Sequence, residues 1–310
     1  MGKPPTPMAA AESWPSLPLE QWKPTYHNLH MWMQMVGKVR LALTPKINHW
    51  WNVPLYVTAR GLTTSPIPYG PDAFEIEFDF IAHKMLINHS DGGQKTLVLE
   101  PRTVAEFYNE FMSTLRLLNI DVSIVPRPVE VADPIPFAED RLYHAYDPEA
   151  AHRCWRILLS ADRVFKEFRA RFVGKSSPVH FFWGSFDLAV TRFSGRRAPD
   201  RPDADSITRE AYSHEVVSAG WWPGGLGVDG PAFYSYTAPE PAGLADQKVS
   251  PEPAFYHRTM KEFILPYDAM RRTPWPDKEL LRFLETTYEA GATLAQWPRT
   301  ELEIAEPPAA

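Results

Sequence analysis

The chain has 310 residues, of which 44% are hydrophobic and 13% aromatic, and its formal net charge is −6 at pH 7. A chain of this length can bury a large core, and its acidic balance argues against a general nucleic-acid binder, which needs a basic excess to neutralise phosphates. A single cysteine, Cys154, excludes an internal disulfide and a cysteine-rich metal site. Because neither an apolar run of about 20 residues nor a secretory signal is present, we expect a cytoplasmic protein without a membrane partner.

The first buried element is a helix predicted over residues 25–43. Its apolar side chains lie nearly all round, which is typical of a helix surrounded by protein. One polar stripe crosses it, because His30, Gln34 and Lys38 stand at positions i, i+4 and i+8. Buried polar groups need partners, so the stripe indicates either a hydrogen-bonded core network or one wall of a pocket.

Two strands are predicted in the segment that follows. A His-Trp-Trp sequence at 49–51 precedes a β-prone run at 53–60. Residues 74–80 alternate apolar with acidic side chains, as a strand with one buried and one solvated face does. We interpret these acids as a solvated face and not as a catalytic cluster.

Helix-start signals and proline content divide the rest of the chain. Thr103 with Glu106 forms a capping box, and Asp147 followed by Pro148 is typical of an N-cap and first helical position. We predict five segments: a flexible leader at 1–20, a first half at 21–126, a proline-rich connector at 127–146, a second half at 147–297 and a loose tail at 298–310.

The most prominent stretch of the second half is residues 180–193, which we interpret as one long central strand. It is rich in Phe, Trp, Leu, Val and Thr, which pack well on a pleated surface. Its ends are polar, since Lys175 and His180 stand at the entry and a Gly-Arg-Arg turn at 195–197 follows the exit. The donors of this turn could hold an anion.

These elements predict an α+β fold with mostly antiparallel sheet, built from two similar helix-strands-helix halves. The His-Trp-Trp at 49–51 lines up with the His-Phe-Phe at 180–182, which indicates an internal duplication. A β-bulge near Gly184 would absorb the one extra residue of the second strand. The halves would then pack about a pseudo-twofold axis, and we expect a small-molecule site in the cleft between them.

We predict that this site binds a small anionic molecule. Groups that change charge or accept protons are the catalytic candidates: His180, His214, Glu215 and Asp187. Asp187 lies between apolar neighbours and needs a partner, for which we consider Arg60, Arg192 and His180. Cationic, polar and aromatic side chains are the candidates for binding: His30, Gln34, Lys38, His49, Arg60, Lys175, Arg192, Arg196, Arg197, Trp183 and Trp222.

Motifs for other chemistries are absent from the sequence. There is no HExxH helix, no G-x-S-x-G elbow, no P-loop and no Rossmann turn. We therefore predict no metal or nucleotide cofactor, and a transition metal held by His49, His180, His214 and Glu215 is the alternative.

Two classes of function remain open. The first is an enzyme using histidine acid–base chemistry on a small organic anion, and the second is a non-catalytic ligand-binding or protein-interaction module. An enzyme should place His180 or His214 beside a carboxylate in a closed pocket. An interaction module should expose Trp221 and Trp222 in an apolar patch.

Four stretches carry a resemblance to a known family: LHMWMQMVGKVRLAL, NHWWNVPLYVTARGLTTSPIPYG, SPVHFFWGSFDLAVTRFSGRRAP and EAYSHEVVSAGWWPGG. Together they resemble an uncharacterised bacterial family of unknown function, over about residues 14–294. The resemblance implies a bacterial protein of a single module. It implies no activity, so the site residues rest on the chemistry of the side chains alone.

Overall fold

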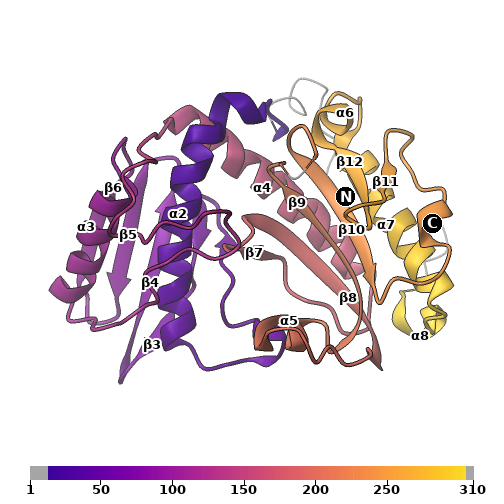
Figure 1. Ribbon diagram of the computed structural model, residues 1–310, viewed down its shortest axis with the longest axis horizontal. Helices are drawn as coiled ribbons and strands as arrows, with labels where there is room; N and C mark the ends of the chain where they lie inside the picture. Colours follow the sequence, from indigo (N-terminus) through magenta and orange to yellow (C-terminus); the bar gives the residue numbers. More distant parts are fainter. Residues whose placement is uncertain (1–12, 226, 305–310) are drawn as a thin grey trace, which may run out of the picture.

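The computed structural model describes residues 13–225 and 227–304. This part of the chain folds into two six-stranded sheets whose paired strands run antiparallel. Figure 1 shows the first sheet at left, beside the long helix α2 (Leu19–Leu43), and the second sheet at right. The predicted α+β class with mostly antiparallel sheet is therefore confirmed.

The first sheet has the strand order β1-β2-β4-β5-β6, with β3 paired to β4. Its strands are β1 (Tyr56–Val57), β2 (Gly61–Thr63), β3 (Ile67–Tyr69), β4 (Asp72–Asp79), β5 (Lys84–His89) and β6 (Gln94–Val98). The alternation predicted for β4 is confirmed over Phe74, Ile76 and Phe78, which are buried, while Glu75 and Glu77 between them are half-buried. The prediction that its acids form a solvated face is wrong for Asp79, which is 3% exposed because it accepts from the amides of two following residues and pairs with Arg60. Helix α3 (Val104–Leu117) begins at the predicted capping box of Thr103 and Glu106.

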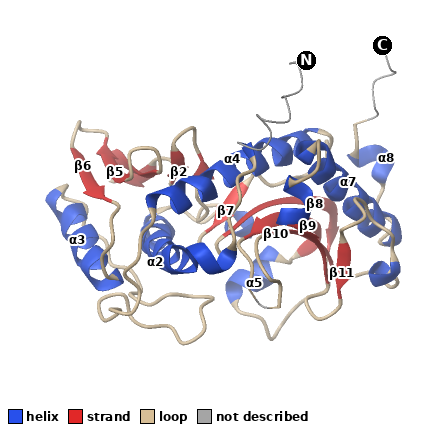
Figure 2. Cartoon of the chain, turned by 90° about the horizontal axis from the view of Figure 1, so that it is seen from above, coloured by secondary structure: helices blue, strands red, loops and turns tan. Residues whose placement is uncertain are grey.

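The second sheet has the order β11-β12-β10-β9-β8-β7. Its strands are β7 (His180–Phe182), β8 (Asp187–Arg197), β9 (His214–Trp222), β10 (Ala232–Ala238), β11 (Phe255–His257) and β12 (Glu262–Pro266). Figure 2 shows helices α4 (Pro148–Ala170) and α7 (Pro276–Leu294) on one side of β8 to β10 and the short helix α5 (Ser206–Ala211) on the other. The remaining short helices are η1 (Asn48–Trp50), η2 (Leu244–Asp246), α6 (Tyr267–Arg271) and α8 (Arg299–Leu302).

The prediction of one long strand over residues 180–193 is wrong. The stretch is a hairpin, in which β7 turns back onto β8 and His180 lies opposite Ala189. Phe186 in the turn has a left-handed φ of 59°, which is rare for a bulky side chain. Residue propensities therefore predict a strand here and not a turn. Gly184, where we expected a β-bulge, lies in this turn, so the chain reverses there instead of continuing.

An internal duplication is not shown by the structure. His49 lies in η1 with a φ of 58° and does not lead a strand, and only Tyr56–Val57 of the predicted 53–60 strand is extended in a sheet. The two strand orders also differ. The sheets are joined by main chain at one place, where Leu55 and Phe181 exchange two hydrogen bonds of 2.9 Å.

The two ends of the described chain are better anchored than predicted. Trp14 is buried in the core and its Nε1 donates to Asp277 at 2.8 Å, so the leader is ordered well before residue 20. At the other end the Leu302 carbonyl accepts from the Val173 amide at 2.8 Å, which ties down the first part of the predicted loose tail. The predictions for residues 1–12 and 305–310 lie outside the described residues.

Candidate functional site

A cavity of about 430 Å³ lies between α2, the β7–β8 hairpin, strands β9 and β10, and α5. Its size falls within the range of roughly 300–1,000 Å³ that is usual for small-molecule sites. We call it the central cavity, and its wall includes Lys38, Trp51, Glu130, Trp183, Asp187 and Tyr234. Aromatic side chains make up much of the wall, and the charged groups reach it from separate elements.

The polar stripe of α2 builds one side of the central cavity. His30 Nε2 lies 2.8 Å from the Gly184 carbonyl, so this ring carries its proton on Nε2 and donates to the turn of the hairpin. Gln34 donates to the Val129 carbonyl and accepts from the Val129 amide, both at 2.8 Å. Gly184 and Val129 both line the cavity. His30 and Gln34 are thus a satisfied core network, and this network fixes two loops of the cavity wall.

Lys38, the third member of the stripe, has a different role. Its side chain is only 5% exposed, and no described residue gives its ammonium a hydrogen bond or an ion pair. The nearest π-face is the indole of Trp183, 5.8 Å from Nζ. Burial lowers the pKa of Lys38. The ammonium therefore faces the cavity as a cation without a protein counter-ion, in a position where an anion that enters the cavity could pair with it.

Asp187 is the buried carboxylate of the same cavity. It is 7% exposed, and the Tyr234 hydroxyl donates to its Oδ2 at 2.5 Å while the Ser185 hydroxyl donates to Oδ1. Gly220 makes this reach possible, because a Cβ at that position would lie 2.4 Å from the Tyr234 hydroxyl oxygen. Burial raises the pKa of Asp187, and the two hydroxyl donors oppose that shift only in part.

The expected ion pairing of Asp187 is wrong. Neither Arg60, Arg192 nor His180 contacts it, and within the described chain no cation pairs with it. Arg60 lies instead on the first sheet, where its Nε is 2.7 Å from Asp79. Within the described residues Asp187 is therefore neutralised by no protein charge, and its oxygens are satisfied by the two hydroxyls and by its own main-chain amide.

Glu130 brings a second carboxyl group to the same end of the cavity. It comes from the connector, with a left-handed φ of 55°, and a Cβ at Gly184 would lie 2.4 Å from its Oε1. Glu130 is exposed at the rim of the cavity, where partial loss of solvent raises its pKa and the negative charges of Asp187 and Asp205 raise it further. The two carboxyl groups are thus close enough to repel each other.

His49 and α5 close another side of the cavity. The Glu210 carbonyl is 3.1 Å from His49 Nδ1, and the Lys175 ammonium is 2.7 Å from Nε2. A carbonyl accepts and an ammonium donates, so the ring is neutral with its proton on Nδ1. The Glu210 carboxylate also pairs with Lys46 at 2.5 Å, which holds α5 against η1.

His180 lies in the core and not in the central cavity, so its position does not suit the predicted catalytic role. Its ring is completely buried between aromatic neighbours, 5.9 Å from the Trp51 ring and 5.6 Å from the Phe182 ring, and it does not line the cavity. Burial, with the charges of two arginines, lowers the pKa of His180 to about 3. A histidine with this pKa stays neutral near pH 7, so it is a poor proton carrier there.

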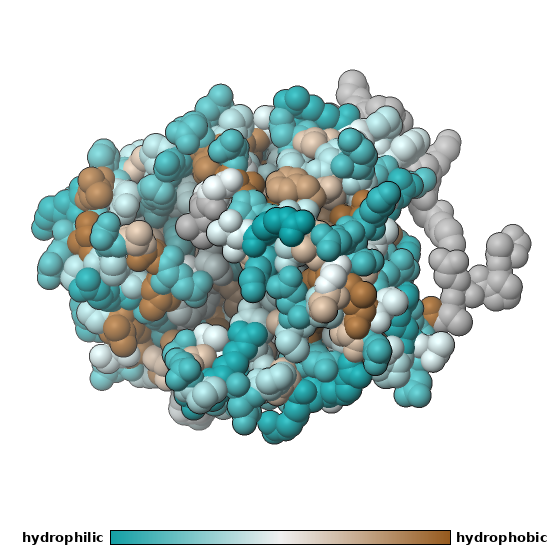
Figure 3. All heavy atoms as spheres, turned by 45° about the vertical axis from the view of Figure 1, so that its right-hand side comes forward, coloured by the Kyte–Doolittle hydropathy of each residue, from teal (hydrophilic) through white to brown (hydrophobic). Residues whose placement is uncertain are grey.

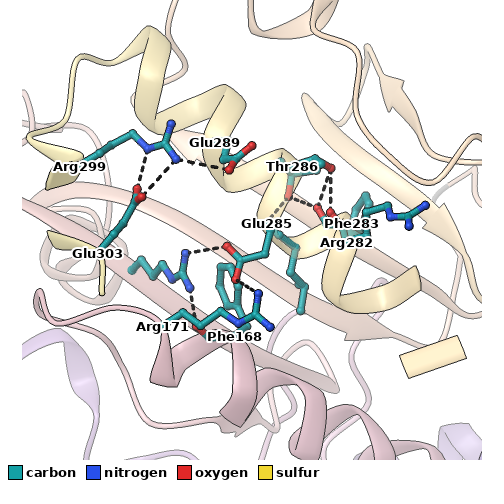
Figure 4. A network of polar contacts seen from close by, with 12 residues as sticks. Phe168, Arg171, Arg282, Phe283, Glu285, Thr286, Glu289, Arg299 and Glu303 are labelled. Carbon is teal, nitrogen blue, oxygen red and sulfur yellow. Dashed lines mark hydrogen bonds and ion pairs between the residues drawn. The ribbon is translucent and has the colours of Figure 1, made fainter. Parts of the chain in front are cut away.

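Arg192 of β8 belongs to the core on the far side of the sheet. The Arg192 guanidinium is 1% exposed and stacks 3.4 Å from the Phe168 ring centre on the face opposite the cavity, where it pairs with Glu285 at 3.4 Å. In Figure 4, Arg171 approaches the same Glu285, while Arg299 pairs separately with Glu289 and Glu303.

Several further candidates lie away from the central cavity. Arg196 is exposed and pairs with Glu215 at 2.7 Å, and Arg197 is exposed as well. His214 contacts the His49 ring at 5.6 Å and a serine hydroxyl, with no carboxylate beside it. Of the four catalytic candidates only Asp187 lines the cavity, and of the binding candidates Lys38, His49 and Trp183 do.

The tryptophan pair does not form the exposed patch expected of an interaction module. Trp221 is fully buried and Trp222 is half-buried, because both belong to β9 and not to a glycine-rich turn. On the face drawn in Figure 3, hydrophobic residues are scattered among hydrophilic ones.

Sequence reasoning missed Glu130, Trp50, Trp51 and the helix α5 as parts of the wall. The connector gave Glu130 no secondary-structure context, and the contacts of Gln34 with the neighbouring Val129 hold this segment beside α2. One local signal for α5 was available, since Asp205 caps Ile207 and Thr208.

In the described ranges no helix is both long and apolar enough to cross a membrane, and no three His, Cys, Asp or Glu side chains gather as a metal site. The prediction that no cofactor is needed stays a prediction. In comparisons with known proteins, the model described as "Family of unknown function (DUF5996)" matches residues 14–304. No curated protein and no solved structure matches the chain.

Proposed function

Because the chain belongs to the DUF5996 family, whose function is unknown, we propose from the central cavity alone that the protein binds a small organic anion. The observation that carries this proposal is Lys38, a largely buried side chain whose ammonium faces the cavity without a protein counter-ion. A carboxylate or phosphate on a ligand would supply the missing charge. The aromatic wall, with Trp51 and Trp183, suits a ligand whose body is apolar or aromatic.

Binding can be followed directly, because Trp50, Trp51 and Trp183 line the cavity and their fluorescence should change when it fills. The probe is 3-phenylpropionate, which carries one carboxylate and does not absorb where tryptophan is excited. Lys38→Met keeps the length of the side chain and removes its charge, so it should weaken binding at least tenfold. Lys23→Met is the matched control, because Lys23 is half-exposed on the same helix. Equal affinity in wild type and Lys38→Met would contradict the proposal.

An enzyme is the second candidate, and Asp187 is the observation that favours it. A buried carboxyl group with a raised pKa beside a ligand site is suited to general acid or base catalysis. In this version Asp187 takes the role that we first assigned to His180. Turnover of a bound compound, followed by mass spectrometry and lost in Asp187→Asn, would establish the enzyme; binding without turnover would favour the non-catalytic alternative.

A further inference from the structure

We propose that the natural ligand is a zwitterion, with its anionic group on Lys38 and an ammonium group between Asp187 and Glu130. This inference rests on the proposed function, because it assumes the anion site at Lys38. It adds a second subsite of opposite charge, and so narrows the ligand to the class of amino acids and related amines that carry an acid group.

The central cavity holds one basic and one acidic group that no protein group of opposite charge neutralises. Lys38 has no carboxylate partner, and Asp187 has only the hydroxyls of Tyr234 and Ser185 and its own main-chain amide. Both groups line the cavity, and no ion pair or hydrogen bond joins them in the described part of the chain. A molecule that spans the cavity with one charge at each end would neutralise both.

The acidic end of the cavity, formed by Asp187 and Glu130, has two carboxyl groups close together. Glu130 is held over Gly184, where a side chain would collide with its carboxyl oxygen, and its charge interacts with that of Asp187. Two carboxyl groups so placed repel each other when both are ionised. A cation between them would remove that repulsion, whereas a second anion would increase it.

Tyrosine side chains surround the acidic end of the cavity. Tyr234 and Tyr236 are stacked with their centres 6.2 Å apart on the β10 side of the cavity. The Tyr212 hydroxyl is 2.9 Å from that of Tyr236. Because the Tyr234 hydroxyl already donates its proton to Asp187, it can only accept from a ligand, which favours an ammonium donor at the acidic end.

The test compares three probes with one skeleton: 3-phenylpropionate as the anion, L-phenylalanine as the zwitterion and phenethylamine as the cation. A parallel set of 4-methylpentanoate, L-leucine and isopentylamine covers an aliphatic body. Affinities are measured by tryptophan fluorescence and calorimetry on the full-length protein. In at least one set the zwitterion should bind tenfold or more tightly than both of its single-charge analogues.

Variants assign that preference to the acidic end. Asp187→Asn keeps the shape of the side chain, and its amide can accept from one of the two hydroxyls and donate to the other once that hydroxyl has turned round. The substitution should reduce the zwitterion's advantage over the anion to less than threefold. Glu130 lies on the exposed rim of the cavity, so Glu130→Gln tests the ammonium subsite without disturbing the core. Glu215→Gln is the control carboxylate, because Glu215 pairs with Arg196 outside the cavity, and it should change no affinity.

The outcomes separate the two proposals. If the anions bind as tightly as the zwitterions, or if the preference survives in both Asp187→Asn and Glu130→Gln, the zwitterion inference is overturned and the anion site at Lys38 stands. If only the amines bind, or if none of the six probes binds, the anion site itself is overturned and the inference falls with it.

Discussion

The ammonium of Lys175 lies 2.7 Å from Nε2 of His49, and the ring of His49 is locked from the other side by the Glu210 carbonyl. This pair of contacts requires a neutral imidazole whose lone pair faces a cation. Protonation of His49 would place two positive charges at hydrogen-bond distance. Burial and the Lys175 charge accordingly lower the pKa of His49.

Lys175→Met should therefore raise the pKa of His49. The same substitution should raise the pKa of His214, which Lys175 also lowers. Titration of the histidine ring protons by NMR measures both values. His30 is the internal control, because Lys175 is not among the groups that shift its pKa. An unchanged His49 titration would show that the contact with Lys175 does not persist in solution.

The buried histidines make stability depend on pH. His180 has a folded-state pKa of about 3 and His30 one of about 4, both below the 6.5 of an unfolded histidine. Between the folded and unfolded pKa values the unfolded chain binds more protons, so acid favours unfolding. The free energy of unfolding should thus fall as the pH is lowered from about 6.5, by up to about 1.4 kcal/mol per pH unit for each ring.

His180→Phe tests this origin of the acid sensitivity. The substitution replaces a ring whose Nδ1 has no hydrogen-bond partner in the described structure with one that suits its aromatic surroundings. Its unfolding free energy should fall less steeply between pH 6.5 and 5, as measured by urea denaturation. His144→Phe, at an exposed position, should keep the wild-type slope. Parallel curves for His180→Phe and wild type would mean that His180 does not titrate in this way.

Gly37 is a second point where packing decides the outcome. A Cβ at Gly37 would lie 2.3 Å from the Trp183 ring, which forms the cavity wall beside Lys38. Helix propensity alone predicts that Gly37→Ala stabilises the protein by about 1 kcal/mol. We expect the opposite, a loss of roughly 1–3 kcal/mol from overpacking, with weaker binding of 3-phenylpropionate. Thermal denaturation gives the sign, and a stabilised variant would contradict the packing at Trp183.

Local signals allowed much of the fold to be predicted from the sequence. The capping box at Thr103 and Glu106, and Asp147 before Pro148, act within one helical turn, and the structure confirms both helix starts. The alternation of β4 likewise reports a buried and a less buried face of the same strand.

Long-range contacts explain what could not be predicted. Asp187 and Tyr234 are 47 residues apart, and they meet only because Gly220 leaves room on the strand between them. The polar stripe of α2 was compatible with a core network or a pocket wall, and it supplies both, since His30 binds the hairpin turn and Lys38 faces the cavity. Sequence spacing showed that these side chains share a face, but not what lies opposite each one.

Substitution of Arg192 tests whether this residue stabilises the fold or binds the ligand. It lies on the face of β8 opposite the cavity, 1% exposed, with its guanidinium against Phe168 and 4.3 Å from the centre of the Tyr288 ring. Arg192→Met leaves Glu285 with only the weaker contact to Arg171, so we expect a loss of roughly 2–4 kcal/mol in unfolding free energy. Arg192→Met combined with Glu285→Gln should recover part of that loss, because no unpaired charge remains.

The affinity for 3-phenylpropionate should stay within twofold of wild type in either variant, and the exposed Arg197→Met should change neither the affinity nor the unfolding free energy. If Arg192→Met instead abolished anion binding while the denaturation curve stayed in place, Arg192 would be the ligand group that its sequence context first indicated, and the anion site would lie elsewhere than at Lys38.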